Sequence, residues 1–376
     1  MIVHFSILFL ILLVSFFYEH KFNSNKIKVI ADGGLASDYK GSIIPWAIVF
    51  GYLIILAGFR FGMNDTTAYI NSFNNLNGSW NEIWNLILGQ GKDKAFDITG
   101  NLFKMYISKD YHAWFLLFAI IESALFCNVL RRESISFFDT CFFLFSSTLY
   151  YNYFSMMRQW FAVAIVFWAS RFIKTNKFIP YLLFCIIAAQ FHNSAYFMII
   201  IYFIVIGDSW NKKQLIILVA FVFALLLLNP LLGTIDSMFS DSTYNYVLDR
   251  MLSNTGSSWI RGLIAAVPVG LSFFYRKNKS KDSMYNICVN MSLINFMLNV
   301  LAIFTSGLFI IRMATYFSIF NLILYPYLLN FVIPEKDRKI VKPLFYFIYL
   351  AFYIYQMTYS SSWVYKSDVL TLLSNY

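Results

Sequence analysis

Apolar stretches alternate with short polar or basic segments along the whole chain. A helix rises about 1.5 Å per residue, so stretches of roughly 15 to 22 residues cross or nearly cross a hydrocarbon core of roughly 30 Å. The pattern predicts about twelve transmembrane helices. They run at about 1–18, 43–59, 112–130, 137–152, 158–173, 178–191, 192–206, 215–232, 259–275, 285–304, 311–332 and 343–360.

Composition supports this interpretation. The 376-residue chain is 59% hydrophobic and only 13% charged, with a mean hydropathy of +0.62, so it has too little polar surface for a soluble fold. We therefore expect an all-α polytopic integral membrane protein that forms a single transmembrane domain over residues 1–376. The formal charge of +10 comes from short basic clusters between apolar runs, which is typical of topology signals and not of a nucleic-acid surface.

Two local patterns refine the picture. Residues 1–18 lack a basic region at their start, and Glu19-His20-Lys21 follows them in place of a small-residue cleavage site, which favours a span over a signal peptide. The short pair of spans around His192 is either a re-entrant hairpin or two tilted helices. The four cysteines lie within apolar runs without metal-site or disulfide spacing, which predicts small buried hydrophobes; they are Cys127, Cys141, Cys185 and Cys288.

Basic residues predict the orientation. Nineteen of the 29 Lys and Arg residues fall on one side of the predicted spans, whereas acids divide evenly. The positive-inside rule places that side in the cytoplasm and both termini outside. Two long outer loops then cover about residues 60–111 and 233–258, and contain the turn formers Asn77-Gly78-Ser79 and Thr255-Gly256-Ser257. Substrate recognition is expected in these extracytoplasmic loops.

Five basic or titratable side chains lie where predicted spans begin or end, all on the predicted outer side. They are Arg60, Arg158, His192, Arg261 and Arg312. Charges at such positions are costly unless they serve a function, although arginines also extend to lipid phosphates. Glu122 lies within a span and is either a functional acid or a satisfied structural residue.

No Walker loop, dinucleotide glycine fingerprint, zinc spacing or Gly-x-Ser-x-Gly elbow is present in the sequence. This pattern gives no support to a nucleotide-driven pump or a soluble-type hydrolase. A substrate that carries its own activated bond would supply the free energy of a reaction.

The motifs near these residues follow one order. The segment from Arg60 to Tyr69 contains Gly62 and Asp65, and Asp65 and Tyr69 share a face if it is helical. Further along come Arg158-Gln159, then Phe191-His192-Asn193-Ser194-Ala195, then Arg312 with Tyr316 four residues later. Asp65 is equally suited to a turn or a helix cap.

This set resembles the EpsG family and the Wzy-type polymerases of bacterial surface polysaccharide, over roughly residues 45–330. The most specific element is Phe-His-x-Ser-Ala after Arg-Gln. The chain departs from the usual Gly-x-Asp-Tyr because Gly62 and Asp65 are one residue further apart and Thr66 replaces the tyrosine. Asp97 is the counterpart of an acid expected before the third span.

The resemblance implies a glycosyltransferase-C-like bundle in the bacterial inner membrane, with its site facing the periplasm. It implies transfer of an undecaprenyl diphosphate-linked chain onto the non-reducing end of a lipid-linked repeat unit, without cofactor or metal and with inversion. The implied partners are lipid-linked oligosaccharides as donor and acceptor, membrane lipid and a chain-length regulator, and not nucleic acid.

The chemistry of the residues fits this reaction. Arginine forks bind a diphosphate bidentately, and we expect Arg158 and Arg312 to be the main clamps, supported by Arg60 and Arg261. His192 is the candidate base because its unperturbed pKa is about 6.5. Asp65 orients that histidine, binds sugar hydroxyls or is itself the base. The remaining predicted substrate contacts are Tyr69, Gln159 and Tyr316.

Three other functions remain open. A lipid-linked oligosaccharide flippase would need basic groups throughout the membrane interior. A membrane O-acyltransferase uses a lone histidine but does not need several outer-facing arginines. The O-antigen ligase reaction uses much the same chemistry as polymerisation, so the sequence separates these two poorly.

Overall fold

The computed structural model describes residues 2–31, 33–39, 41–89, 91–227, 257–278, 280, 282–305, 307–359 and 364–370. Regular structure in these residues is helical, apart from one isolated antiparallel β-bridge between Gly62 and Lys366. The end of the predicted span 215–232 and nearly all of the predicted outer loop 233–258 lie outside the described residues.

The chain divides into two compact units, which we describe separately. Unit 1 comprises Met1–Tyr202 and Glu335–Tyr376, and unit 2 comprises Phe203–Pro334. The single transmembrane domain expected from the sequence stays a prediction.

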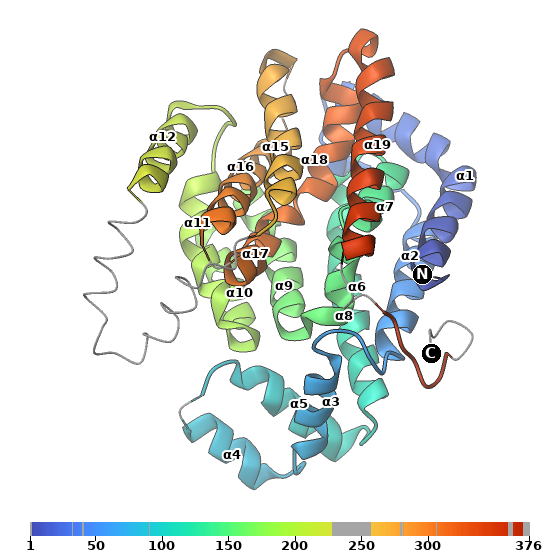
Figure 1. The fold of residues 1–376 in the computed structure, drawn as a ribbon, viewed down its shortest axis with the longest axis vertical. Coiled ribbons are helices and arrows are strands. Elements are labelled where there is room, and N and C mark those ends of the chain that lie inside the picture. The colour runs from blue at the N-terminus through green and yellow to red at the C-terminus, as the bar shows by residue number, and fades with distance from the viewer. Residues whose placement is uncertain are drawn as a thin grey trace. The chain divides into compact units, whose positions relative to one another are not determined.

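Unit 1 holds most of the helices (Figure 1). They are α1 (Ile2–Ala31), α2 (Ile44–Gly58), α3 (Thr66–Asn75), α4 (Trp80–Leu88), α5 (Lys94–Tyr106), α6 (Tyr111–Glu133), α7 (Phe137–Ser146), α8 (Asn152–Ser155), α9 (Met157–Lys174), α10 (Phe178–Phe191) and α19 (Glu335–Tyr359). A 3-10 turn, η3 (Asn193–Tyr196), follows α10 and leads into α11 (Phe197–Val205). Unit 2 contains α12 (Lys212–Leu226), α15 (Trp259–Phe274), α16 (Ser283–Phe304), α17 (Gly307–Ser318) and α18 (Asn321–Tyr327).

Three of the described helices are long and apolar enough to cross a membrane, namely α6, α16 and α19. A fourth span results if the pair Ile310–Ser318 and Asn321–Val332, which bends by 47°, is one broken span. Other apolar helices are shorter. With 14 residues, for instance, α10 covers about 21 Å. The structure thus shows an all-α, multi-pass type of membrane protein, while the count of twelve spans stays a prediction.

Each predicted span overlaps a helix of the structure, but two predictions need correction. The segment 137–152 is not one helix, because Thr148 adopts a positive φ of 67° and separates α7 from a 3-10 turn and α8. The segment 60–111 is not a plain loop, because it folds into α3, α4 and α5. The turn predicted at Asn77-Gly78-Ser79 is confirmed: Gly78 has φ +63° and the Ser79 hydroxyl accepts a hydrogen bond from the Glu82 N–H at the start of α4.

The helices α2 and α6 position the site-bearing segment. They pack so closely that a Cβ added at Gly58 would lie 2.2 Å from the Leu116 side chain, so only glycine fits there. Asp110 caps α6 by accepting the His112 N–H at 2.9 Å. The helices α3, α4 and α5 lie together at one end of unit 1, beyond α8 and the neighbouring ends of α9 and α10 (Figure 1).

A C-terminal strap, residues 364–370, fastens the turn after α2. The Phe61 N–H donates to the Lys366 carbonyl at 2.8 Å, and the Lys366 N–H donates to the Gly62 carbonyl at 3.1 Å. The Tyr365 hydroxyl donates to the Leu56 carbonyl at 2.9 Å. The strap therefore fixes the stretch of chain that carries Arg60.

Candidate functional site

An ion pair joins α9 to the helices of the 60–111 segment. Arg158 is the second residue of α9, and its Nη2 lies 2.9 Å from Asp97 Oδ1 on α5. The same nitrogen donates to the Ser72 hydroxyl of α3 at 3.4 Å. The guanidinium carbon lies 4.5 Å from the centroid of the Phe96 ring. Three helices thus converge on Arg158.

The pair is only partly buried. The side chains of Arg158 and Asp97 are 25% and 23% exposed, so both are reachable from solvent. Burial raises the pKa of the Asp97 carboxyl; the charge of Arg158 opposes that shift, and Asp93 and Glu82 add to it. Arg158 Nε has no hydrogen-bond partner among the described residues. The guanidinium therefore retains donor capacity beyond Asp97 and Ser72.

His192 ends α10 and begins η3. Its extended backbone, with φ −155° and ψ 115°, breaks the helix there. Its Nδ1 lies 2.6 Å from the Ser194 hydroxyl, and the side chain is half-buried. The next residue, Asn193, donates its N–H to Asp93 Oδ1 at 2.8 Å. Because Asp93 is the N-cap of α5, the turn that carries His192 is fastened to the helix that carries Asp97.

An aromatic cluster joins the four helices α5, α6, α9 and α10. Its members are Phe96, Phe118, Phe161 and Phe191. Ring centroids are 5.1 Å apart between Phe96 and Phe118, and 4.6 Å apart both between Phe118 and Phe161 and between Phe161 and Phe191. Offset and edge-to-face contacts at these separations are favourable beyond the area they bury. The cluster holds the start of α9 and the end of α10 at the same end of unit 1.

Arg60 lies in the interior of unit 1 and is 1% exposed. Its guanidinium donates to the Ala57 carbonyl, to the Thr66 hydroxyl at 3.3 Å and to Met157 Sδ at 3.7 Å, and it stacks 4.2 Å from the Phe115 ring centroid. Burial lowers the pKa of Arg60 to about 10, and the charge of Glu122 opposes the shift. The side chain is thus a buried cation within the protein, one residue away from Arg158 through Met157.

The other predicted residues of unit 1 occupy varied positions. Asp65 is the N-cap of α3 but its side chain makes no cap hydrogen bond, and its carbonyl accepts the Tyr69 N–H at 3.2 Å. The Tyr69 ring lies 5.9 Å from Phe96, on the same aromatic residue that Arg158 covers. Gln159 is 3% exposed.

Arg261, Arg312 and Tyr316 belong to unit 2 and are described with it. Arg261 is the third residue of α15 and is half-buried. Arg312 does not begin a helix as expected, because α17 starts five residues earlier at Gly307. Tyr316 is 1% exposed.

Several residues of the site were not singled out from the sequence. Ser72, Asp93, Phe96 and Asn193 lie in polar or amphipathic segments where nothing in the pattern marks them. Asp93 and Asp97 are four residues apart at the start of a helix, a spacing that places two acids on one face. That spacing was the available signal.

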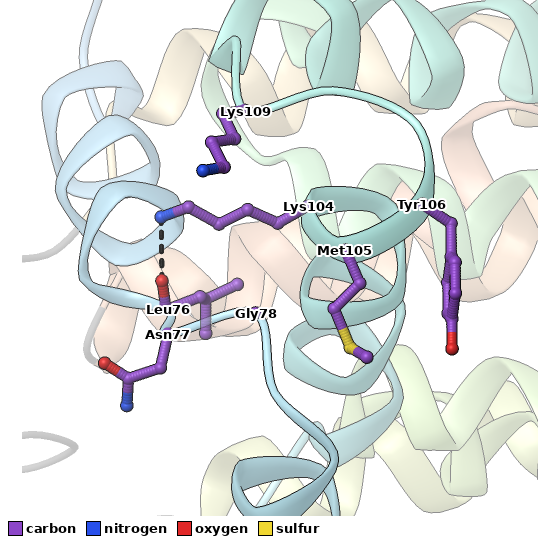
Figure 2. Close-up of a pocket in the computed structure, with 7 residues that line it drawn as sticks. All are labelled: Leu76, Asn77, Gly78, Lys104, Met105, Tyr106 and Lys109. Atoms are coloured by element: carbon purple, nitrogen blue, oxygen red, sulfur yellow. Dashed lines mark hydrogen bonds between the residues drawn. The ribbon is translucent and has the colours of Figure 1, made fainter.

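A cavity of about 540 Å³ lies between the turn after α3 and the last turn of α5. Figure 2 shows its lining, with Lys104 and Lys109 extending in the same direction. Lys104 Nζ donates to the carbonyls of Asn74 at 2.8 Å and Leu76 at 2.7 Å. The lining residues are Leu76, Asn77, Gly78, Lys104, Met105, Tyr106 and Lys109.

Metal ligation finds no support in the described residues, which contain no group of three or more His, Cys, Asp or Glu suited to an ion. The four cysteines, all described, are buried and none forms a disulfide, as the sequence predicts.

Comparison with curated proteins found no match, and comparison with solved structures found none either. Comparison with protein families, in contrast, matches the EpsG family over residues 43–367. That range includes the Arg158–Asp97 pair, His192, Arg261 and Arg312. The chain belongs to the EpsG family.

Proposed function

We propose that this protein is a polysaccharide polymerase of the bacterial inner membrane. It transfers an undecaprenyl diphosphate-linked glycan chain onto the non-reducing end of a lipid-linked repeat unit on the periplasmic face. Family membership supports a role in polysaccharide biosynthesis. The finer proposal rests on the partly exposed Arg158–Asp97 pair. Asp97 lies on α5, and the N-cap residue of that helix, Asp93, accepts a hydrogen bond from the turn that carries His192.

Arg158 stabilises the leaving group. When the bond between the anomeric carbon and the diphosphate oxygen breaks, its electron pair stays on the undecaprenyl diphosphate, whose negative charge grows. A guanidinium fork aimed at that oxygen stabilises the charge without a metal. The partial exposure of Arg158 supports this role, because Asp97 and Ser72 engage only Nη2.

His192 serves as the base. The acceptor hydroxyl attacks the anomeric carbon, a new C–O bond forms, and the hydroxyl proton passes to the imidazole. The Ser194 hydroxyl, 2.6 Å from Nδ1, orients the imidazole, and the ring nitrogen that carries the lone pair in the reactive tautomer accepts this proton. The anomeric configuration inverts, because one displacement occurs from the face opposite the leaving group.

Other residues take supporting roles. Asp65 and Tyr69 contact sugar hydroxyls near Phe96, while diphosphate binding by Arg261 and Arg312 stays a prediction from the sequence. Because Arg60 is buried and contacts Met157, we assign it to positioning the start of α9 and not to direct substrate contact. A chain-length regulator is a proposed partner.

The test is a gel of surface polysaccharide from cells lacking the gene, complemented with wild type, Arg158→Ala or His192→Ala at matched protein levels. Arg171→Ala is the matched control. It removes an arginine from the same helix, near its other end, where the guanidinium stacks 3.4 Å from the Trp168 ring centroid.

The proposal expects the ladder to collapse to a single repeat unit for Arg158→Ala and His192→Ala, and to persist for Arg171→Ala. An unchanged ladder in cells lacking the gene would exclude polymerisation and favour acyl modification. Loss of even the single repeat would point to flipping or ligation.

A further inference from the structure

The cavity between α3 and α5 is held open by contacts that leave it little freedom to collapse. Lys104 Nζ bonds to the Phe73 carbonyl at 3.2 Å in addition to those of Asn74 and Leu76, and so satisfies the C-terminal end of α3. The Gly78 N–H donates to Asn101 Oδ1 at 2.9 Å, which fastens the opposite wall to α5. A pre-formed cavity of this kind is typical of a ligand site.

Its volume and its lining suit a small polar ligand. About 540 Å³ falls within the range of roughly 300–1,000 Å³ of ligand pockets. Leu76 and Met105 provide an apolar surface, and Asn77 provides an amide. The lining contains no acid, so the cavity accepts neutral or anionic groups and disfavours cations.

Only one of the two lysines is available to a ligand. Lys104 places all three of its N–H donors on backbone carbonyls. Lys109 is exposed, and no hydrogen bond or ion pair engages it among the described residues. It therefore provides an ammonium group for a ligand hydroxyl or acid.

Tyr106 lines the cavity and contacts a second aromatic residue, Trp80, which is not among the lining residues. The Trp80 indole N–H donates to the Tyr106 hydroxyl at 3.1 Å, although Trp80 and Tyr106 are 51% and 66% exposed. Two aromatic side chains held in a fixed orientation yet left open to solvent provide an apolar face with polar edges. That combination matches a sugar ring, whose C–H face is apolar and whose rim carries hydroxyls.

The cavity lies close to the proposed site along α3. Ser72 contacts Arg158, and Leu76 lines the cavity four residues later, a separation of about 6 Å along a helix axis. The cavity is therefore within reach of a glycan whose diphosphate is held at Arg158.

We propose that this cavity is a glycan subsite that binds a saccharide segment of the lipid-linked substrate. Lys109 and Asn77 bind its hydroxyl or acidic groups, and the Tyr106–Trp80 pair packs against a sugar face. The subsite rests on the proposed function for its choice of ligand but is tested by binding, without turnover.

The experiment measures binding to the full chain in lipid nanodiscs by titration calorimetry. The probes are oligosaccharides of one, two and three repeat units released from the cell's own surface polysaccharide. Wild type is compared with Lys109→Ala and Tyr106→Ala. The control is Lys92→Ala, which removes another exposed lysine of the same segment that does not line the cavity.

Wild type and Lys92→Ala are expected to bind equally, while each cavity variant binds about tenfold more weakly, the loss typical of one hydrogen bond to a charged group. Equal binding by all four proteins overturns the subsite, as does absence of binding to wild type. Failure of the polymerase proposal is seen separately, as a ladder that persists in cells lacking the gene.

Donor and acceptor glycans are distinguished in cells. If the cavity binds the growing donor chain, Lys109→Ala shortens the ladder in cells. In the titration, the wild type then binds the longer oligosaccharides more tightly, and a stronger preference for them goes with a greater shortening. A subsite for the acceptor leaves chain length unchanged and favours the single repeat unit in the titration. Either result supports a glycan subsite and assigns its occupant.

Discussion

At the residue scale, the main feature is the contrast between two arginines that the chain places close together. The sequence places Arg60 and Arg158 alike at the ends of predicted spans. In the structure, the Arg60 side chain is buried and the Arg158 side chain is partly exposed. Met157 connects them, because its sulfur accepts from Arg60 while its neighbour Arg158 pairs with Asp97. The buried arginine thus contacts the start of α9, and the partly exposed one is the proposed substrate contact.

Arg60 and Glu122 provide a test of that support. Both are buried, and the carboxylate's Oε1 has no hydrogen-bond partner among the described residues. No ion pair joins the two described side chains, so the charge of Glu122 acts on Arg60 across a longer distance, and removing either group takes away that favourable interaction. We expect Arg60→Met and Glu122→Gln each to lower the melting temperature of the purified protein, and the double variant to lose less than the two losses added together. Strict additivity would show that the two charges do not interact.

Asp97 predicts a pH dependence. Burial, the largest cause, raises the pKa of its carboxyl in the folded protein despite the opposing charge of Arg158. A raised folded-state pKa contributes stability that is fully present below the unfolded value of about 3.9 and is lost as the pH rises through the folded-state pKa. As the pH falls from 7 to 4, the melting temperature of wild type should therefore rise relative to that of Asp97→Asn. A constant difference, or one of opposite sign, would contradict the shift.

At the element scale, specific polar contacts add to aromatic packing in the helices of the 60–111 segment, where buried phenylalanines pack against Trp114. Lys104 is the main example, because it holds three carbonyls at the C-terminal end of α3. A cation at this end of a helix also interacts favourably with the helix dipole. The position of Ser72, and with it one contact of Arg158, follows from that single lysine.

Replacing Lys104 by methionine should destabilise α3 locally by about 1 kcal/mol, since the carbonyls lose a charged donor. Hydrogen exchange of the backbone amides of residues 66–76 measures the effect, which we expect as faster exchange confined to this helix. Lys92→Met, at an exposed position, serves as the control and should exchange like wild type. Unchanged protection in Lys104→Met would mean that tertiary packing alone holds α3.

The strap at residues 364–370 gives a second prediction at this scale. Lys366→Pro removes the N–H that donates to the Gly62 carbonyl, whereas Lys366→Ala keeps it. The proline variant should lose exchange protection at Phe61 and Gly62 and make less polymer, while the alanine variant behaves like wild type. Equal loss in both variants would assign the effect to the lysine side chain and not to the backbone ladder.

Helices were the most predictable part of the fold, because an apolar stretch in a membrane must satisfy its own backbone groups. Every predicted span accordingly overlaps a helix within the described residues. The helices α3 to α5 escaped prediction because they are short and polar, and contacts such as those of Lys104 with carbonyls 28 to 31 residues away create them. The break after α7 depends on a local backbone conformation at Thr148 that the apolar pattern hides.

The candidate site was predictable only in part, for a similar reason. Arg158 and His192 could be singled out because a charge at the end of a span is energetically costly. The structure places both residues at helix ends. The hydrogen-bond partners that orient them lie in a different segment of the chain. These are Asp97 and Ser72 for Arg158, and Asp93 for the turn of His192. Burial of Arg60 could not be foreseen, because its span-end position looks the same as that of Arg158.

At the scale of the whole molecule, the open question is on which side of the membrane each unit presents its polar ends. The charge distribution predicts that the segment 60–111 faces outward and that the turns near residues 278 and 339 face the cytoplasm. The proposed reaction needs this arrangement, since lipid-linked repeat units are joined on the periplasmic face. Unit 1 provides one test on each side, and unit 2 provides a further test of the cytoplasmic side.

Cysteine labelling decides the orientation. Because the four native cysteines are buried, new ones at Asn81, Asn278 and Lys339, all exposed, should report without background. An impermeant maleimide added to intact spheroplasts should label Asn81→Cys alone, and Asn278→Cys and Lys339→Cys should react only after permeabilisation. Labelling of either cytoplasmic position in intact spheroplasts would place that unit the other way round. A reversed unit 1 would put Arg158 and His192 on the cytoplasmic side, where the proposed polymerisation does not take place.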